Sequence, residues 1–326
     1  MNVKNKVFNL IKEAKNILIC GHIYPDGDSI GSSFGLALSL RNLGKKVAVI
    51  KNDEYTKYLD FMYREDLYLN EDNKADFEDL DLFISVDSSS IDRIEGSEEY
   101  FSKAKTTACI DHHITNTHYC DYNYVLDASS ACEMVAQFLM DNNVEIPKDA
   151  ASFLYLGILT DTNRFNYQSS NSNTLRVAAN LLDLGADKAY IHDNLYETLD
   201  PKKLIFETDA IKNATYIGDK IVVAKVVQED LDKYDLSVED VEGLVSLLRT
   251  IKGIEVSAVV KEDGENSQKL SFRSQNIVDV SKIALEFGGG GHVRASGASQ
   301  EGSNDEVFNK VVKRLERLYE DGDLSR

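Results

Sequence analysis

A short turn near the N-terminus gathers side chains that suit metal chemistry. His22, Asp26 and Asp28 fall within seven residues, directly after the apolar segment 16–21. The proline and glycine in this stretch favour a tight turn, so the imidazole and the two carboxylates can converge on one point. An ordinary polar turn at the start of a helix is the alternative for this motif taken alone.

Three further acidic or histidine-rich positions follow apolar segments. Asp87 ends the run DLFISVD, the triplet Asp111-His112-His113 ends TACIDHH, and Asp161 follows an apolar, helix-like run. Any one of them could be a helix cap or a polar residue whose hydrogen bonds are made locally. Together with the turn at 22–28 they make four such segment ends in one domain, which indicates a shared site. Carboxylates together with imidazoles suit hard divalent cations, and Mn²⁺ suits a mixed His/Asp site. The absence of cysteine from these clusters argues against structural zinc.

This set of side chains is large enough to hold two metal ions, which predicts phosphoester hydrolysis. Two ions about 3.5–4 Å apart activate a hydroxide for attack on phosphorus and offset the charge that develops there. The chain contains no G-x-x-x-x-G-K-S/T loop. Nucleotide-powered phosphoryl transfer of the P-loop type is therefore disfavoured.

A glycine-rich segment in the second half predicts a place for an anion. Four glycines, 288–291, precede His292, and glycines let the backbone approach a ligand closely and present N–H groups to it. A flexible surface loop is the alternative. Arg273 lies near the end of the strand-like run QKLSFRS, and its guanidinium could donate two parallel hydrogen bonds to the same phosphate or carboxylate. Taken alone, an arginine at a strand end is more often a surface residue.

The elements that must position these side chains alternate along the first half of the chain. Strand-like apolar runs occupy 16–22, 46–50, 81–87 and 107–111, and helical patterns occupy 29–44 (with Ser29 as the cap), 130–142, 149–161 and 172–185. Short apolar runs and helical periodicity of this kind predict buried strands and amphipathic helices. Their alternation predicts an α/β fold with a doubly wound, mostly parallel sheet, whose sites lie beyond the carboxyl ends of the strands.

The second half has a different pattern. Apolar and polar residues alternate, as they do in strands, over segments 215–227, 254–264 and 268–274. A last helix is expected at about 305–321. These segments predict a smaller, mixed α+β domain. We therefore expect a metal-binding catalytic domain over 1–186, a helical linker region over 187–204 and a substrate-binding domain over 205–326.

Composition limits the class of partner. The net charge is −19, with 18 basic and 32 acidic side chains in the first 200 residues against 18 and 23 in the rest. Such a chain should not adhere to long nucleic acids or to anionic membranes. No segment is apolar enough to span a bilayer, the N-terminus lacks the apolar core of a signal peptide, and the four cysteines form no CxxC pair. We therefore expect a cytoplasmic protein with reduced thiols.

Taken together, these motifs resemble the DHH phosphoesterase superfamily, which is named for the triplet that stands here as Asp111-His112-His113. The resemblance covers essentially the whole chain. The first half is similar to the catalytic DHH domain, and the second half is similar to the DHH-associated domain with its GGGH signature. Size and order are most similar to the NrnA-type group of oligoribonucleases (nanoRNases), which also act as 3′-phosphoadenosine-5′-phosphate (pAp) phosphatases.

The resemblance implies two Mn²⁺ ions per chain, with Mg²⁺ as a substitute. One ion would be held by His22, Asp26 and Asp87, and the other by Asp28, Asp87, His112 and Asp161. Asp87 would bridge the two ions and would form the catalytic set together with Asp111 and His113. Asp111 would orient the histidine pair, and His113 would contact the scissile phosphate and help the leaving oxygen depart.

The resemblance also implies a set of substrate-binding residues. Those in the second half would hold the other phosphate or the terminal nucleotide, namely Arg273, Ser274, Gly289, Gly290, Gly291 and His292. Asn116, after the DHH triplet, would support the site on the substrate side. The family often has TDTG where this chain has Thr-Asp-Thr-Asn over 160–163, and ASST where it has Ala-Ser-Ser-Ala over 128–131. Neither departure removes an expected metal ligand, but both could alter the shape of the pocket.

The function expected from this resemblance is manganese-dependent hydrolysis of oligonucleotides of about two to five nucleotides, RNA or DNA, to mononucleotides. The same site would act as a pAp phosphatase. The expected partners are therefore short oligonucleotides or small phosphonucleotides, with a homodimer expected from the resemblance alone. One alternative is a phosphodiesterase for linear dinucleotides such as pApA, which arise in cyclic-di-AMP turnover. Another is a nucleotide-binding sensor that has lost catalysis, which predicts a missing metal ligand, and none is missing.

Overall fold

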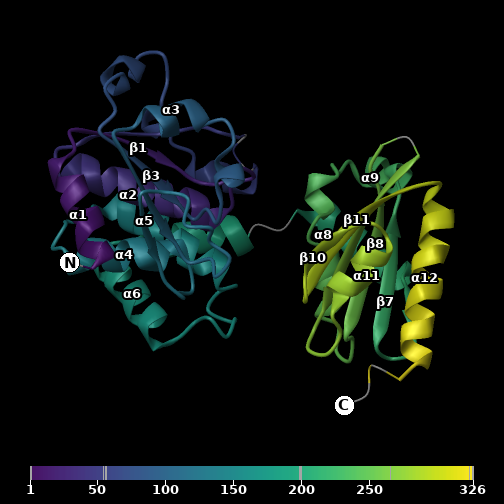
Figure 1. Cartoon of the computed structure of the whole chain (residues 1–326). Coiled ribbons are helices and arrows are strands. Elements are labelled where there is room, and N and C mark those ends of the chain that lie inside the picture. The colour runs from purple at the N-terminus through teal and green to yellow at the C-terminus, as the bar shows by residue number, and fades with distance from the viewer. Residues whose placement is uncertain are drawn as a thin grey trace. The chain divides into compact units, whose positions relative to one another are not determined.

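The chain forms two compact units. The computed structural model describes residues 2–53, 55, 57–197, 200–264, 266–322 and 324. Unit 1 is Met1–Thr198 and unit 2 is Leu199–Arg326 (Figure 1). Each unit has its own hydrophobic clusters. Within the described part of the chain, no helix combines the length and the apolar character that crossing a membrane requires.

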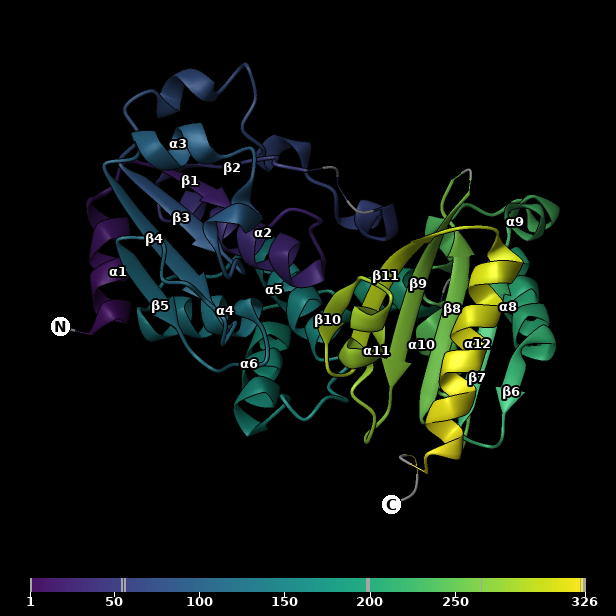
Figure 2. The same ribbon diagram turned by 45° about the vertical axis from the view of Figure 1, so that its right-hand side comes forward.

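Unit 1 is built on a five-stranded sheet whose strands are all parallel (Figure 2). The strands are β1 (Asn16–Cys20), β2 (Lys46–Val49), β3 (Leu82–Val86), β4 (Thr106–Asp111) and β5 (Tyr122–Val125), in the order β2-β1-β3-β4-β5. This confirms the predicted α/β fold. β5 was not predicted, because only Tyr124 of its four residues is buried and the segment lacks an apolar run.

The helices of unit 1 are α1 (Val3–Glu13), α2 (Gly27–Asn42), α3 (Glu98–Lys103), α4 (Ala131–Asp141), α5 (Lys148–Asp161), α6 (Ser172–Asp183) and α7 (Lys188–His192). Helices α2, α4, α5 and α6 lie close to the predicted positions, whereas α3 was not predicted. α2 begins two residues earlier than expected, and its N-cap is Asp26, not Ser29. The Asp26 carboxylate accepts hydrogen bonds from the backbone N–H groups of Asp28 and Ser29, as an N-cap side chain does.

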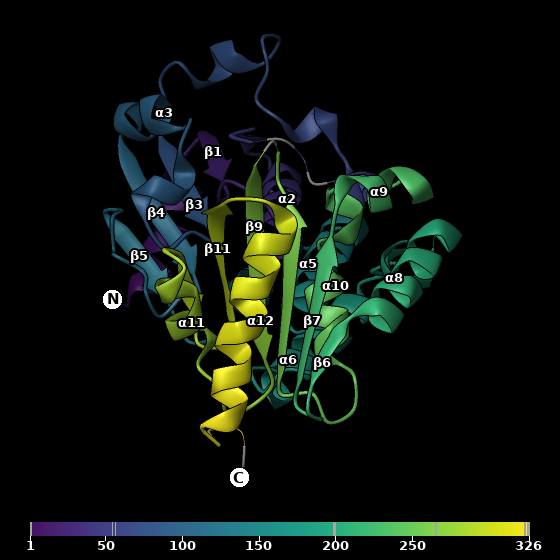
Figure 3. The same ribbon diagram turned by 90° about the vertical axis from the view of Figure 1, so that its right-hand side faces the viewer.

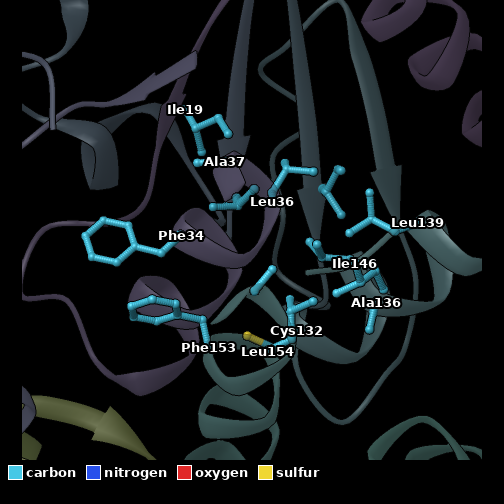
Figure 4. Close-up of a cluster of buried hydrophobic side chains, with 14 of the residues drawn as sticks. Ile19, Phe34, Leu36, Ala37, Cys132, Ala136, Leu139, Ile146, Phe153 and Leu154 are labelled. Atoms are coloured by element: carbon cyan, nitrogen blue, oxygen red, sulfur yellow. The ribbon is translucent and has the colours of Figure 1, made fainter. Parts of the chain in front are cut away.

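The main core of unit 1 lies between one face of the sheet and helices α1, α2, α4, α5 and α6 (Figure 4). Within this layer α2 and α5 pack so closely that glycines line the contact. An added Cβ on Gly31 would stand 2.5 Å from the Phe153 carbonyl oxygen, and one on Gly27 would stand 2.3 Å from Thr160 Oγ1. The first turn of α2 therefore lies against the last turn of α5. A smaller cluster covers the opposite face of the sheet, where Phe83 packs with residues of α3 and of nearby 3₁₀ turns.

Unit 2 contains a six-stranded mixed sheet in the order β10-β11-β9-β8-β7-β6. The strands are β6 (Thr215–Ile217), β7 (Ile221–Val226), β8 (Val256–Glu262), β9 (Ser267–Ser274), β10 (Gly290–His292) and β11 (Ala295–Glu301). The single strand expected over 215–227 is in fact a pair, because the chain turns at Gly218 with a φ of +58° that glycine adopts readily. The glycine-rich segment is partly a strand, since Gly290–His292 pairs with β11.

Helices cover both faces of this sheet. They are α8 (Pro201–Asn213), α9 (Gln228–Tyr234), α10 (Leu244–Arg249), α11 (Val280–Glu286) and α12 (Asn304–Glu320). α11 and α12 pack on the face that carries Leu270 and Phe272, and Figure 3 shows α12 running along the sheet. α8, α9 and α10 pack on the other face, against Val222 and Val259. The mixed α+β architecture predicted for the second half is confirmed.

Candidate metal centre

The expected metal ligands of unit 1 gather at the carboxyl edge of its sheet. His22 follows β1 and Asp87 follows β3, and these two strands are neighbours. The chain nevertheless leaves β1 towards β2 on the other side, so the strand order reverses between β1 and β3. Open α/β sheets bind ligands at such a switch point. Asp111, the last residue of β4, lies at the same edge.

The structure brings the expected ligands into three overlapping groups. These are Asp87 with His112 and His113, then His22 with Asp26 and Asp87, and finally Asp28 with His112 and Asp161. Within each group, one donor atom from every residue lies within 4.8 Å of the others. Because Asp87 and His112 each belong to two groups, the three groups form one continuous cluster.

Asp87 connects the two sides of this cluster. Its Oδ2 lies 3.5 Å from His22 Nε2 and its Oδ1 lies 3.3 Å from His112 Nε2. The side chain is 3% exposed, and Oδ1 has no hydrogen-bond partner among the described residues. A buried charged oxygen without a partner is costly, by more than about 1–3 kcal/mol. A cation bound at this oxygen would remove that cost, so the donor set fits a metal ion.

Asp28 is fixed by the start of α4. Its Oδ2 accepts a hydrogen bond of 2.6 Å from the backbone N–H of Ala131, and its Oδ1 accepts one of 2.9 Å from Cys132. These are the first two N–H groups of the helix, which favour negative charge. Burial nevertheless raises the pKa of Asp28, and the nearby charges of Asp87 and Asp161 raise it further. The carboxylate is therefore held in place while its charge is incompletely compensated, as a cation ligand requires.

His22 is oriented by a backbone carbonyl and an arginine. Its Nδ1 lies 2.7 Å from the Ile23 carbonyl oxygen, and Arg93 Nη2 donates to the same oxygen at 3.1 Å. A proton on Nδ1 leaves Nε2 free to bind a metal. Burial lowers the pKa of His22, but hydrogen bonds to Asp26 and Asp87 outweigh it and raise the pKa to about 10. Binding of a metal ion at Nε2 would release the proton that this raised pKa favours.

His112 and Asp161 form the other side of the cluster. His112 Nε2 lies 3.7 Å from Asp28 Oδ2 and 3.8 Å from Asp161 Oδ2, in addition to its contact with Asp87. Burial lowers the pKa of His112, but these carboxylates raise it to about 10. The pKa of Asp161 is raised to about 6, chiefly by burial and against the opposing effect of His112. The pKa values of both groups are thus shifted by burial and by the other charges of the cluster.

His113 differs from its neighbour because it forms a separate pair with Asp111. His113 Nδ1 lies 2.7 Å from Asp111 Oδ1, and Asn116 Nδ2 donates to Asp111 Oδ2 at 2.6 Å. Asp111 is fully buried, whereas 41% of the His113 side chain is exposed. The hydrogen bond to Asp111 raises the pKa of His113. Asn116, expected on the substrate side, is buried and contacts Asp111 directly.

In unit 2, pairing across three strands aligns two of the expected substrate residues. Arg273 of β9 is opposite Ala295 of β11, which is opposite His292 of β10. Directly opposed residues share a face, and strands lie about 4.8 Å apart, so the Arg273 and His292 backbones are roughly 10 Å apart with a small alanine between them. Ser274 is on the opposite face, where its buried hydroxyl donates to the Val278 carbonyl oxygen at 2.6 Å.

The glycines before His292 allow this alignment. An added Cβ on Gly289 would stand 2.1 Å from the Gly297 carbonyl oxygen, and Gly291 has a φ of +134° that only glycine adopts readily. Gly290, between them, is opposite Gly297 and has open space around its Cα. The segment therefore forms a close-packed edge strand, with His292 exposed at its end.

One residue of the site was not found from the sequence. Arg93 was missed because it follows Asp87 by six residues without a recognised motif, and only the fold shows that it contacts the His22 turn. The departure at Asn163 has a backbone explanation: its φ is +47°, a left-handed conformation that asparagine tolerates better than most residues with side chains. Asparagine can thus replace the expected glycine without changing the turn after Asp161.

Comparisons with known proteins agree with these observations. The model of the DHH family, N-terminal domain, matches residues 16–158, and that of the DHHA1 domain matches residues 218–321. A bifunctional oligoribonuclease and PAP phosphatase NrnA from Thermus thermophilus is 31% identical, covering 91% of this chain and 88% of the relative. The protein of that name from Mycoplasma pneumoniae is 30% identical, covering 90% of each chain. A crystal structure of an exopolyphosphatase-related protein from Bacteroides fragilis superposes with a TM-score of 0.86 at 28% identity, covering 97% of each chain.

Proposed function

The chain belongs to the DHH family of metal-dependent phosphoesterases, and on that premise we propose that it hydrolyses oligonucleotides of about two to five nucleotides to mononucleotides and removes a phosphate from pAp. It is a hydrolase of phosphodiester or phosphomonoester bonds. The observation that carries the proposal is the buried carboxylate of Asp87, placed between His22 and His112. The names of the NrnA relatives support the choice of substrates.

Two Mn²⁺ ions are part of the proposal. One would be bound by His22, Asp26 and Asp87, and the other by Asp28, Asp87, His112 and Asp161. Mixed carboxylate and imidazole donors suit Mn²⁺ and also admit Mg²⁺. Bound ions of this kind lower the pKa of water and offset negative charge on a reacting phosphate. Titration of the ion-free protein with Mn²⁺ should give a stoichiometry of about two per chain.

His113 supplies a proton in this proposal. Its Nδ1 is occupied by Asp111, so its Nε2 is the atom that can donate to the leaving oxygen. Asp111 keeps the imidazole oriented and favours its protonated form, and Asn116 holds Asp111 by its second oxygen. We therefore assign Asn116 a positioning role and not direct contact with the substrate.

Arg273 and His292 are proposed to bind a phosphate that is not cleaved. They share one face of the unit 2 sheet, with the small residue Ala295 between them. The backbone of Gly290, which has no neighbour within 4 Å of an added Cβ, can approach the same phosphate. Ser274 would act indirectly, because its hydroxyl fixes the chain that follows β9.

The test is hydrolysis of pAp, pApA and RNAs of two, three, five and twenty-four nucleotides, with Mn²⁺, Mg²⁺ or a chelator. Asp87→Ala provides the inactive control. We expect Mn²⁺-dependent release of mononucleotides from the short RNAs and of phosphate from pAp. Cleavage of pApA alone would assign the chain to dinucleotide turnover, and tight nucleotide binding without hydrolysis would indicate a sensor. Light scattering of the same preparation tests the expected homodimer.

A further inference from the structure

A polar cavity of about 310 Å³ lies at the end of the unit 2 sheet where β7 and β8 begin and β9 ends. Backbone hydrogen bonds join the three strands there. The Lys220 carbonyl oxygen accepts from the Glu255 N–H at 2.7 Å, and the Glu255 carbonyl oxygen accepts from the Gln275 N–H at 2.9 Å. None of the described lining residues belongs to the metal cluster or to the residues proposed above to bind substrate. Cavities of this size are large enough to hold a small ligand.

The chain that follows α10 forms one wall of this cavity. α10 ends at Arg249, and the loop back to β8 carries the exposed Lys252. Gly253 in this loop has a φ of +96°, and an added Cβ would stand 3.3 Å from the Asp219 carbonyl oxygen. The loop therefore lies close against the turn before β7. This contact brings Arg249 and Lys252 to the cavity that Lys220 also lines.

The described lining contains three cations, Lys220, Arg249 and Lys252, and one carboxylate, Glu255. Across the described part of the chain, the side chains of the three cations form no ion pair and no hydrogen bond. Arg249 Nε is buried and has no acceptor among these residues. Buried donors in native proteins are nearly always paired, and an unpaired donor of a charged group is costly. A bound anion would supply the guanidinium with acceptors.

Glu255 does not compensate these cations, because its carboxylate is used by the backbone. The side chain belongs to a residue that is 6% exposed. Its Oε1 accepts hydrogen bonds from the N–H groups of Ile277 at 2.5 Å and Val278 at 3.0 Å, and its Oε2 accepts one from Asn276 at 3.2 Å. Within the described residues it pairs with no lysine or arginine. The cavity is therefore positively charged.

We propose that this cavity binds the phosphate group of a small molecule. The Arg249 guanidinium can donate two parallel hydrogen bonds to phosphate oxygens, and the ammonium groups of Lys220 and Lys252 act as mobile point charges beside it. Inorganic phosphate and nucleoside monophosphates share this chemistry. The inference does not rest on the proposed function, because the cavity lies in unit 2 and contains no residue of the metal cluster.

The rest of the wall suits a group attached to the phosphate. Isoleucines 251, 254 and 277 provide apolar surface, and Gln275 and Asn276 carry side-chain amides. Binding sites for small molecules typically combine an apolar wall with a few polar groups that fix the orientation of the ligand. A nucleoside monophosphate would match both parts of this lining, whereas inorganic phosphate would use the cations alone.

The experiment is calorimetric titration of the full chain in EDTA with inorganic phosphate, AMP and adenosine. The variants are Lys220→Met/Lys252→Met and Arg249→Met, since methionine keeps most of the apolar length of these side chains. Lys225→Met/Lys310→Met is the matched control, because it removes two positive charges from the far end of β7 and from α12. Arg273→Met removes the phosphate site proposed above and thereby separates it from this cavity.

We expect phosphate and AMP to bind about tenfold more weakly to Lys220→Met/Lys252→Met and to Arg249→Met, as loss of a charge-assisted hydrogen bond predicts. The matched control should bind as the wild-type chain does. Arg273→Met should keep the binding that the cavity variants lose. No binding of either probe, equal affinities in the cavity variants and the control, or loss of all phosphate binding in Arg273→Met would overturn the proposal.

A measurement on the wild-type chain tests the site without any variant. Saturating AMP or phosphate should slow hydrogen exchange in peptides that cover 218–222 and 249–254, by up to about 100-fold at 100 times the dissociation constant. Both segments contribute to the cavity and neither contains Arg273 or His292. Binding of AMP and phosphate without slower exchange in these peptides would contradict the proposal.

Comparison of the three probes identifies the source of the phosphate. AMP that binds at least about tenfold more tightly than inorganic phosphate would indicate a nucleotide site, and equal affinities would indicate a site for free phosphate. Adenosine that binds as tightly as AMP would overturn the assignment to a phosphate group. Hydrolysis of pAp with Mn²⁺ tests the proposed function separately, so its absence would leave these binding results intact.

Discussion

Asp87 has a left-handed backbone, with a φ of +52°, directly after a regular strand. Residues with side chains adopt this conformation at a cost, and such positions cluster at functional sites. The carboxylate that it holds reaches His22 with one oxygen and His112 with the other. A single residue at one strand end thus connects ligands that come from two other strand ends.

Replacing Asp87 by asparagine should abolish metal-linked stabilisation. In the wild-type chain, Mn²⁺ at 100 times its dissociation constant should add about 2.7 kcal/mol to the free energy of unfolding. Asp87→Asn should gain almost nothing from Mn²⁺, because it lacks the carboxylate that lies between His22 and His112. Thermal unfolding with Mn²⁺ or EDTA measures both effects.

The control for this experiment is Asp72→Asn, which changes an exposed carboxylate by the same atoms. It should keep the full response to Mn²⁺. An equal Mn²⁺ response in the Asp87 variant would show that this carboxylate is not a ligand.

Arg93 should affect metal affinity although it is not a ligand. It holds the Ile23 carbonyl oxygen that orients His22, and residues that orient a ligand typically change metal affinity about 10–100-fold when they are removed. We expect Arg93→Met to weaken Mn²⁺ binding by that factor, as measured by calorimetric titration. Arg64→Met, at an exposed ion pair in the same unit, should leave the affinity unchanged. Loss of thermal stability without a change in Mn²⁺ affinity would assign Arg93 a merely structural role.

Residue types and spacing predicted the residues that the structure gathers at the carboxyl edge of the unit 1 sheet, because each group of them follows a recognisable apolar segment. They could not predict Arg93 or the contact of Asn116 with Asp111, since both depend on the path of loops that lack periodicity. The direction of the Ser274 side chain could have been predicted from a simple rule. Adjacent residues in a strand point to opposite faces, so Arg273 and Ser274 cannot both face the same ligand.

Among the elements, the contact between α2 and α5 positions Asp28 against Asp161. It depends on glycines at 27, 31 and 35 of α2, where a Cβ would meet α5 or residues near it. This close approach explains why α2 contains three glycines although glycine disfavours helix interiors. The periodicity of the sequence predicted both helices, but it contained no sign that their backbones touch.

Gly31→Ala should therefore destabilise the protein despite the better helix propensity of alanine. The new Cβ would lie 2.5 Å from the Phe153 carbonyl oxygen and 2.8 Å from Cys132 Sγ. Overpacking of this kind typically costs about 1–3 kcal/mol, which exceeds the gain of about 1 kcal/mol from propensity. Urea unfolding measures the difference. Gly243→Ala, whose Cβ would have no neighbour within 4 Å, should change the free energy of unfolding by less than about 0.5 kcal/mol.

Strand prediction succeeded where burial is continuous and failed where strands are short. β1, β3 and β4 were predicted because buried parallel strands are apolar along their length. β5 was missed. β6 and β7 were predicted as one strand, because the turn at Gly218 interrupts the segment for only a few residues. The role of 290–292 as an edge strand was not predicted either, since glycines give no alternating pattern.

In the whole molecule, the metal cluster belongs entirely to unit 1, whereas the cavity lined by Lys220, Arg249 and Lys252 belongs entirely to unit 2. The change of pattern along the sequence predicted two domains of different class because buried parallel strands and alternating mixed strands differ in composition. It could not predict this cavity, since its three cations meet only through the pairing of β7 with β8 and the path of the loop after α10.

This separation predicts where Mn²⁺ should slow hydrogen exchange. Because ligand binding stabilises only the conformations that hold the ligand set, amides of β1, β3 and β4 should exchange about 100-fold more slowly at 100 times the dissociation constant. Amides of β8 and β9 should be unaffected. Exchange with and without Mn²⁺, followed by mass spectrometry of peptides, measures this. Equal slowing in both units would show that they unfold together.

The members of the metal cluster stand at the ends of β1, β3, β4 and α5 or at the start of α2, and the remaining residues of those segments are mostly core. A substitution at one such end should therefore remove a proposed metal ligand without changing how the helices and the sheet pack. The residues of unit 2 that are proposed to bind substrate, Arg273 and His292, are untouched by that change. The Asp87→Asn chain should accordingly serve as a substrate trap, a receptor that captures an intact short RNA and can be crystallised with it.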